Sequence, residues 1–286
     1  MITSDYHIHT EYSCDDACMT YNTLIKKAKI RGIKDFGVTD HIHTPFNHPD
    51  IKNSHEMFMK KKIEGMHFGV EVSAVSKWEL DKIALGDYEG NITYGIREGG
   101  IPEGELAIAI DEAFIKKYDI EFVVGGTHWL MYKEYTRENL IHDYHRQNLF
   151  LANHPLIDIV AHPWWYMGPF KNERNLYTTL PWFDDFKVIP QSIHVELAEA
   201  LIKNGKFHEV NLSAILLSNH YTEHFKKQYL EYLAFMQDLG VKFTVGSDCH
   251  NENYDIDFIH SNSLIEKYGI KIENNLFSAL KKVTGR

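Results

Sequence analysis

Short apolar runs alternate with longer stretches of helical periodicity along almost the whole chain. The apolar runs span residues 2–8, 34–39, 66–72, 120–126, 157–161, 208–213 and 242–247. Stretches with apolar residues at helical spacing lie between them, at about 20–31, 53–64, 105–118, 137–153, 191–205 and 222–239, with a last one near 273–283. Seven strands that alternate with helices predict a parallel sheet. At this chain length the sheet is either open and doubly wound or closed into a barrel.

One stretch, residues 73–104, does not follow this alternation. It comes directly after the third apolar run and shows neither a strand pattern nor a clear helical one. We interpret it as an insertion after the third strand. No low-complexity tract, internal repeat or Ser/Pro-rich linker divides the rest of the sequence.

Most of the predicted strands end in a histidine or a carboxylate. The first run ends in HIHT, where His7 and His9 are two positions apart and therefore share one face of the strand. The last run ends in GSDCH, which repeats this spacing with Asp248 and His250. The remaining candidates are Asp15, close behind the first strand, and His41, Glu71, His128 and His162 at the ends of the second to fifth runs. In parallel α/β architectures ligands bind at this edge of the sheet.

These nine side chains form a set of nitrogen and oxygen donors. The set is too large for one metal ion and large enough for two or three. Imidazole and carboxylate donors favour Zn²⁺, Mn²⁺ or Fe²⁺ over Ca²⁺ or Mg²⁺. Glu71 lies in a strongly apolar strand, where an unpaired carboxylate would be costly to bury, and this also favours a metal partner. His43, His48, His55 and His67 lie off the pattern, and we interpret them as bystanders, like the histidines on predicted helices and loops.

The charge of the chain limits its partners. Its 286 residues include 30 basic and 40 acidic side chains, for a net charge of −10, and no basic stripe could follow a nucleic-acid backbone. We therefore expect no nucleic-acid partner, and bound metal ions would have to supply positive charge for an anionic substrate. Three cysteines without a CxxC pair, no bilayer-length apolar run and no signal-peptide core predict a cytoplasmic protein without a membrane partner.

The quoted motifs resemble those of the PHP family, which is named for polymerase and histidinol phosphatase. They are HIHTEYS with Asp15, TDH at 39–41, GVEV at 69–72, the histidine of THW, AHP at 161–163 and GSDCH at 246–250. The resemblance extends along nearly the whole chain. It implies that residues 1–286 form a single domain, a distorted (β/α)7 barrel of the TIM-like α/β class with a trinuclear metal centre at its C-terminal mouth.

The resemblance also implies a role for each donor. His7, His9, Glu71 and Asp248 would hold one metal ion, and Glu71 would bridge to a second ion. His128 and His162 would complete the second site, and Asp15, His41 and His250 would hold the third ion.

Within the family, the motifs are most similar to those of single-domain histidinol-phosphate phosphatases. EVNLS at 209–213 is similar to a strand of those enzymes, although ILLSNHY after it lacks the glycine and arginine expected there. The resemblance implies a metal-dependent phosphatase that hydrolyses a small phosphate monoester, such as histidinol phosphate in histidine biosynthesis. Asp248, His250 and Glu71 are the candidate catalytic residues.

The substrate is expected to meet two further kinds of residue. Arginine is scarce in the chain, and we interpret Lys171 and Arg174, after the fifth strand, as candidate phosphate-binding residues. Trp129, Trp164 and Trp165 follow predicted metal ligands and either pack the barrel mouth or form the apolar wall of a pocket.

Three alternatives remain open. A PHP-type exonuclease or phosphodiesterase is disfavoured by the acidic composition. An amidohydrolase-like enzyme would share the HxH signature but would need a bridging lysine on the fourth strand, and IEFVVGGTHW contains none. A non-catalytic module of the same fold is expected to have lost ligands, and here all nine are present.

Overall fold

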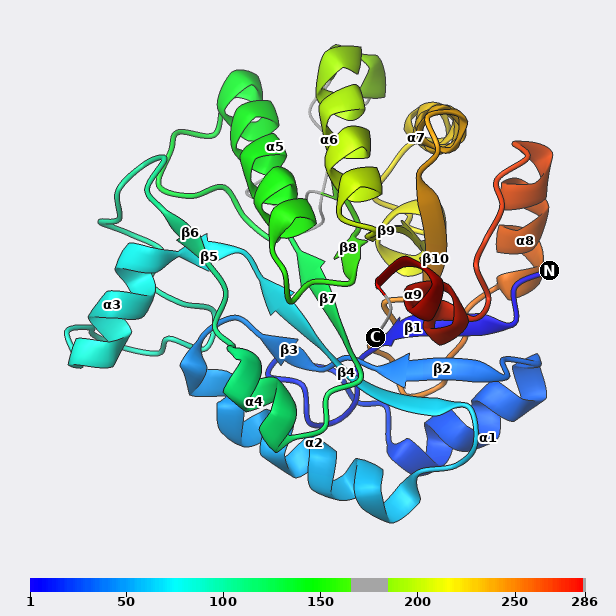
Figure 1. The fold of residues 1–286 in the computed structure, drawn as a ribbon, viewed down its shortest axis with the longest axis horizontal. Helices are drawn as coiled ribbons and strands as arrows, with labels where there is room; N and C mark the ends of the chain where they lie inside the picture. Colours follow the sequence, from blue (N-terminus) through cyan, green and yellow to red (C-terminus); the bar gives the residue numbers. More distant parts are fainter. Residues whose placement is uncertain (166–184, 285–286) are drawn as a thin grey trace.

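The structure, a computed structural model, describes residues 1–165 and 185–284. Seven parallel strands succeed one another around a nearly closed barrel, as predicted for a TIM-like α/β protein (Figure 1). They are β1 (Ser4–Ile8), β2 (Asp35–Val38), β4 (Met66–Ser73), β7 (Phe122–Gly126), β8 (Ile159–Ala161), β9 (Phe207–Asn211) and β10 (Lys242–Gly246). The short strand β3 (His41–Ile42) also pairs with β4.

The barrel closes where β10 meets β1. Ile8 forms an isolated parallel bridge with Cys249, and the His9 N–H donates to the Cys249 carbonyl at 3.1 Å. The barrel therefore closes just beyond β10, where the pair His7 and His9 meets the pair Asp248 and His250.

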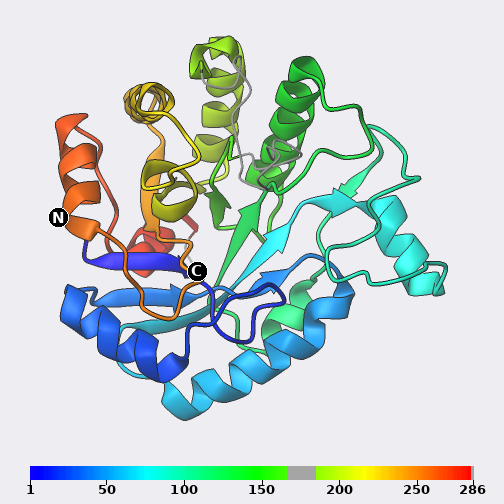
Figure 2. The ribbon, with the colours of Figure 1, turned by 180° about the vertical axis from the view of Figure 1, so that it is seen from behind.

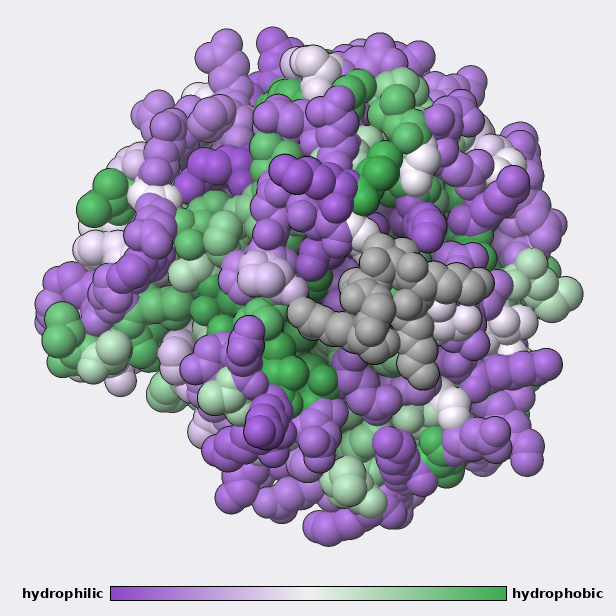
Figure 3. All heavy atoms as spheres, in the orientation of Figure 1, coloured by the Kyte–Doolittle hydropathy of each residue, from purple (hydrophilic) through white to green (hydrophobic). Residues whose placement is uncertain are grey.

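Helices cover the outside of the barrel, with α1 and α2 on one side and α5, α6 and α7 on the other (Figures 1 and 2). The bounds of these five helices are α1 (Tyr21–Arg31), α2 (His48–Lys61), α5 (Arg137–Asn153), α6 (Gln191–Lys203) and α7 (Glu223–Asp238). A further helix is α8 (Phe258–Lys267). Hydrophilic side chains dominate the face drawn in Figure 3, as amphipathic helices around a core predict. Among the described residues no helix is long and apolar enough to cross a bilayer.

Local signals in the sequence account for the ends of several helices. The side chain of Thr20 accepts a hydrogen bond from the Thr23 N–H at the start of α1, and Gly32 ends the helix in the left-handed conformation, with φ 74°. Thr136 and Thr222 cap α5 and α7 in the same way.

The segment between β4 and β7 has structure that the apolar pattern did not reveal. It contains β5 (Val75–Ser76), α3 (Lys77–Leu85) and β6 (Leu106–Ala107), and β5 pairs antiparallel with β6. The helix predicted at 105–118 is wrong in its first half. Pairing takes Leu106 and Ala107 into β6, and α4 (Glu112–Lys117) begins only after its cap, Asp111.

The inside of the barrel is layered along its axis. Near the N-terminal ends of the strands, an apolar cluster joins four of the barrel strands to α9 (Leu276–Thr284), which is dark red in Figure 1. Its buried members are Tyr6, Phe122, Val124, Ile159, Ala161, Phe207, Leu276 and Ala279. Nearer the C-terminal ends, on the same inner face, apolar side chains give way to Glu71 and Glu209, which are 0% and 1% exposed. Two charged groups at this depth need specific partners.

Candidate metal centre

All nine predicted donors lie together at the C-terminal mouth of the barrel. His7 and Glu71 lie within β1 and β4, and His41 begins β3. The others follow strand ends: His9 and Asp15 after β1, His128 after β7, His162 after β8, and Asp248 and His250 after β10.

Four of the donors surround one point. The Nε2 atom of His7 lies 3.0 Å from His9 Nε2, 3.1 Å from Glu71 Oε2 and 3.6 Å from Asp248 Oδ1. His9 Nε2 lies 3.4 Å from the same Glu71 oxygen and 3.3 Å from the same Asp248 oxygen. Ligands at roughly 2.0–2.1 Å from a tetrahedral zinc ion lie roughly 3.3 Å apart. The spacing therefore fits one metal ion.

The other oxygen of Glu71 faces a different pair of imidazoles. Glu71 Oε1 lies 3.2 Å from His128 Nε2 and 3.0 Å from His162 Nε2. Each carboxylate oxygen thus points into its own group of histidines, which is the arrangement of a bridging ligand.

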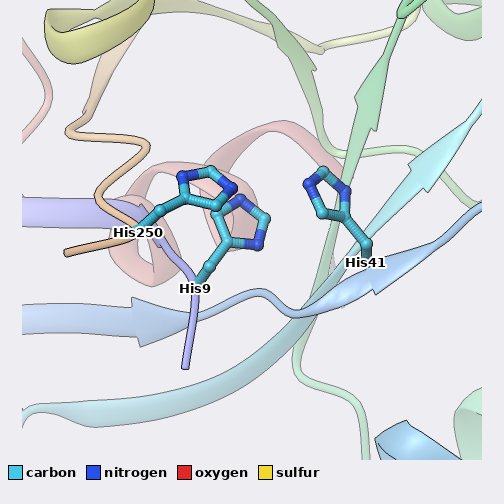
Figure 4. Close-up of side chains that lie close together, drawn as sticks. All are labelled: His9, His41 and His250. Atoms are coloured by element: carbon cyan, nitrogen blue, oxygen red, sulfur yellow. The ribbon is translucent and has the colours of Figure 1, made fainter. Parts of the chain in front are cut away.

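The remaining donors form a third group at the edge of the mouth. Asp15 Oδ2 lies 2.7 Å from His250 Nε2 and 3.5 Å from His41 Nε2. Figure 4 shows His9, His41 and His250 close together, on segments far apart in the sequence. The His9 ring stacks on each of the other two at a centroid distance of 4.2 Å, and those two rings lie 5.9 Å apart.

Several buried atoms of this cluster have no hydrogen-bond partner among residues 1–165 and 185–284. They include Asp15 Oδ1, and also Glu71 Oε2 and His41 Nδ1, which lie 2.8 Å apart without the geometry of a hydrogen bond. Leaving such atoms unpaired costs free energy, because burial removes the hydrogen bonds that water would make. The unpaired atoms, the donor types and the spacing fit bound divalent metal ions.

The electrostatics of the cluster favour the metal-binding protonation states of Glu71 and His9. Burial would raise the pKa of Glu71, but the charges of His7 and His41 outweigh it and hold this pKa well below its usual range. Burial, together with the neighbouring imidazoles of His250 and His41, lowers the pKa of His9 to about 3. A neutral imidazole and an ionised carboxylate are the forms that bind metals.

Two of the predicted ligands have a strained backbone. Asp248 and His162 have positive φ values of 54° and 29°. Non-glycine residues adopt this region rarely and at a cost, and such residues gather at functional sites.

Glu209 contacts the cluster from deeper in the barrel, and the sequence pattern did not predict a role for it. Its Oε1 lies 2.6 Å from His7 Nδ1, and its Oε2 accepts hydrogen bonds from the His162 N–H and the Asn211 amide. Because Glu209 occupies Nδ1 of His7, the other ring nitrogen, Nε2, faces His9 and Glu71. Gly246 makes room for it, since a Cβ there would lie 1.8 Å from Glu209 Oε1. The available signal was the alternation of Glu209 and Asn211 on one face of β9.

Asp5 ties β1 to the end of β10. Its carboxylate accepts hydrogen bonds from the backbone N–H groups of His7 and Ser247 and from the Tyr254 hydroxyl. Burial raises the pKa of Asp5 to about 6. Asp5 precedes His7 by two positions, so the period-two pattern extends one step further than predicted.

His43 lies in the wall of the site, contrary to its interpretation as a bystander. Its Nδ1 lies 2.7 Å from the Ser73 hydroxyl, which is in turn 2.8 Å from His128 Nδ1. The sequence contained the signal, because His41 and His43 repeat the HIH spacing of His7 and His9. Burial, with the imidazoles of His41 and His128, lowers the pKa of His43 well below its usual value.

Two cavities open at the cluster. The larger, about 520 Å³, is lined by Asp15, Asp16, His41, His43, Tyr94, His128, Trp129, His162, Trp165, Asp248 and His250. The other, about 390 Å³, shares Trp165, Asp248 and His250 with it and is otherwise lined by Ser213, Ala214, Ser218, Asn219 and His220. Trp129 and Trp165 therefore form walls of the site, whereas Trp164, 3% exposed, belongs to the core.

The predicted phosphate-binding residues, Lys171 and Arg174, lie outside the described residues.

Together, the parallel barrel and the ring of imidazole and carboxylate donors at its C-terminal mouth define a barrel protein with a candidate multinuclear metal centre. A family model described as "PHP domain" matches residues 5–213. The chain therefore belongs to the PHP family. A comparison with curated protein sequences found no significant match.

Two solved structures are similar over most of their length. One is a histidinol phosphate phosphatase from Lactococcus lactis in complex with zinc, L-histidinol and phosphate, 17% identical, with a TM-score of 0.58 over 94% of this chain and 95% of that chain. The other is a putative histidinol phosphatase from Listeria monocytogenes, 12% identical, with a TM-score of 0.57 over 91% of this chain and 99% of that chain. At these identities the likeness shows the fold.

Proposed function

We propose that this protein is a metal-dependent phosphoesterase that hydrolyses a small phosphate monoester, with histidinol phosphate as the leading candidate. The observation that carries the proposal is the position of Glu71, whose two oxygens face two separate groups of histidines. A bridging carboxylate holds two cations close together, as two-metal hydrolysis of a phosphate ester requires.

Three groups of residues would hold the ions, and the proposal uses the ligands expected from the sequence. His7, His9, Glu71 and Asp248 form the first group, Glu71, His128 and His162 the second, and Asp15, His41 and His250 the third. Bound Zn²⁺, Mn²⁺ or Fe²⁺ would lower the pKa of water toward about 7 and neutralise charge on the phosphoryl oxygens.

The chain's own residues have distinct tasks in this proposal. Glu71 fixes the distance between two of the groups, and Glu209 orients His7 among them. Asp248 and His250 line both cavities, so they are the candidates for the group that gives a proton to the leaving alcohol. Trp129 and Trp165 offer aromatic surfaces to that leaving group.

Membership of the PHP family supports the reaction class. The Lactococcus structure, which contains L-histidinol and phosphate, is the reason to rank histidinol phosphate first. The acidic composition supports a small substrate over a nucleic acid, because a polymer would need a cationic track.

The test is a screen of phosphate monoesters, histidinol phosphate included, on protein loaded separately with Mn²⁺, Zn²⁺ and Fe²⁺. We expect kcat/KM for histidinol phosphate to exceed that for p-nitrophenyl phosphate and for a phosphodiester. Equal values for the two monoesters would leave a phosphatase with another substrate, and preference for the diester would contradict the monoesterase proposal.

Metal content checks the proposal independently of turnover. Protein purified without chelator is expected to carry about two or three transition-metal ions per chain, measured by elemental analysis. Failure to bind any of the three metals after reconstitution would refute the metal centre itself.

A further inference from the structure

The segment between β4 and β7 places a positive charge at the edge of the larger cavity. In the loop after α3, the guanidinium carbon of Arg97 lies 3.3 Å from the centroid of the Trp129 ring. Trp129 lines the cavity, and its ring centroid lies 5.2 Å from that of His43, another lining residue. Arg97 therefore contacts the cavity wall at Trp129, although it is not itself a lining residue.

The loop that carries Arg97 is anchored before it. Ile92 is 2% exposed, and its carbonyl accepts a hydrogen bond from the Thr44 hydroxyl at 3.2 Å. Tyr94, the next side chain but one, lines the cavity with its ring centroid 5.4 Å from that of His43. This part of the loop therefore forms part of the cavity wall.

The loop is also fixed directly beside Arg97. The Tyr132 hydroxyl lies 3.2 Å from the Ile96 carbonyl and 2.9 Å from Oε2 of Glu79, a residue that is 1% exposed. Gly95, with φ 88°, passes so close to Glu79 that a Cβ would lie 1.9 Å from its Oε1. Glycine at 95 is thus required for this path of the chain, and the path delivers Arg97 onto Trp129.

The guanidinium keeps its hydrogen-bonding capacity. The buried charge of Glu79 acts on Arg97, yet no hydrogen bond or ion pair joins Arg97 to another residue within 1–165 and 185–284. Stacking occupies one face of a guanidinium and leaves its N–H edge free. That edge is the part that binds phosphate oxygens through paired hydrogen bonds.

We propose that Arg97 binds the phosphate group of the substrate and acts beside the metal ions as the cationic anchor of the site. The inference rests on the proposed function, since it assumes a phosphate monoester in the larger cavity. It assigns the anchoring role to the segment between β4 and β7. In a chain of net charge −10, a fixed cation beside this cavity gives an anionic substrate a place to bind.

The test compares Arg97→Ala and Arg97→Lys with wild-type protein and a control, Lys82→Ala. Lys82 belongs to the same segment and lies 5.9 Å from the ring centroid of Trp78, but its ion-pair partner is Asp87. Each protein is loaded with the same metal, and its metal content and thermal unfolding are recorded. The measurements are the dissociation constant of inorganic phosphate, by calorimetry, and KM and kcat for the best monoester.

Arg97→Ala is expected to raise both the phosphate dissociation constant and KM by about 10- to 100-fold, the effect of one lost charge-assisted contact. Its kcat is expected to change by less than about threefold, because an anchor acts on binding more than on chemistry. Arg97→Lys should lie between, since it keeps the charge and loses the planar fork. Lys82→Ala should match wild type.

The two proposals fail in different ways. If the wild type hydrolyses monoesters and folded, metal-loaded Arg97→Ala binds phosphate within about twofold of it, the anchor is wrong and the phosphatase stands. If Arg97→Ala weakens phosphate binding but the wild type hydrolyses no monoester, the anchor stands and the reaction is wrong. Wild-type protein that binds no phosphate would overturn both.

Discussion

Histidine and carboxylate side chains gather at both ends of the barrel, on the same neighbouring strands. At the N-terminal ends of β2, β4 and β7, His67 lies between two carboxylates. Its Nε2 is 3.1 Å from Asp35 and its Nδ1 is 2.9 Å from Glu121. Both nitrogens of this imidazole have a partner, and Asp35 and Glu121 also accept hydrogen bonds from Tyr6 and Phe68.

The cluster at the C-terminal mouth is built in the opposite way. Glu71 meets imidazoles on both oxygens, and within the described part of the chain one buried polar atom each of Glu71, His41 and Asp15 makes no hydrogen bond. The first cluster is complete without a ligand and the second is not. Residue composition therefore does not single out a candidate metal site here, whereas the convergence of buried imidazole and carboxylate groups that do not satisfy one another does.

The largest difference between the two clusters is expected when one carboxylate charge is removed from each of them in turn and kcat is compared. Glu71→Gln keeps the shape of the side chain but removes the negative charge that, in the proposed function, two cations share. It is expected to lower kcat by at least ~10², on the scale of lost catalytic electrostatics. Steady-state kinetics on the best phosphate monoester, with metal content recorded in parallel, measures the effect.

The matched control is Glu121→Gln at the opposite end of the same sheet, with the exposed Glu89→Gln as a surface control. Both should keep kcat within about threefold of wild type. If Glu71→Gln behaved like either of them, the bridging role would be wrong.

A smaller effect is expected at Glu209, which contacts the cluster but belongs to none of its three ligand groups. Glu209→Gln removes the negative charge of the carboxylate that fixes His7 through Nδ1. It should raise the metal dissociation constant by about 10- to 100-fold, as for other outer carboxylates that orient a ligating histidine. Competition with a chromophoric chelator gives the constant, and unchanged affinity would show that His7 is oriented without Glu209.

The smallest effect is expected at the other end, in stability rather than activity. Burial would lower the pKa of His67, but its hydrogen bonds to Asp35 and Glu121 outweigh it and raise this pKa to about 9. A pKa raised on folding stabilises the protein fully below the unfolded value of about 6.5, and the contribution is lost as pH rises through 9. His67→Gln should therefore lower stability at pH 6 by about 1 kcal/mol or less, and by less at pH 10.

Denaturant midpoints of wild type and His67→Gln at pH 6 and pH 10 provide the measurement. The exposed His260→Gln serves as control and should show no such difference between the two pH values. A larger loss at pH 10 than at pH 6 would mean that His67 is stabilising in its neutral form.

The sequence predicted the strands well because buried parallel strands are short apolar runs. The seven predicted runs agree with β1, β2, β4, β7, β8, β9 and β10 to within a few residues at each end. The pattern failed where pairing partners decide the structure. Leu106 and Ala107 lie in a helix-like stretch but pair with β5. The helices α3 and α8 were missed because their apolar positions are few or interrupted.

The candidate ligands were predictable for a related reason. Strand alternation places His7 and His9 on one face, and parallel strands bring their C-terminal ends to one edge. The supporting residues were not predictable in this way. Asp5 and Glu209 lie inside strands β1 and β9 and not at their ends, so they appear in the sequence only as polar residues that interrupt an apolar run. His43 was interpreted as a bystander although it lies two positions after His41.

The sequence by itself thus determined the order of strands and helices, the face on which each candidate ligand lies, and membership of the PHP family. Only the tertiary structure decided which donors share a point in space. Barrel closure brings Ser247 to Asp5, 242 positions apart, and with it Asp248 to His7. It also placed Arg97 on Trp129 and α9 beneath the apolar layer. The physical reason is that periodicity records only whether a side chain faces inward, whereas contact between distant segments depends on the packing of the whole barrel.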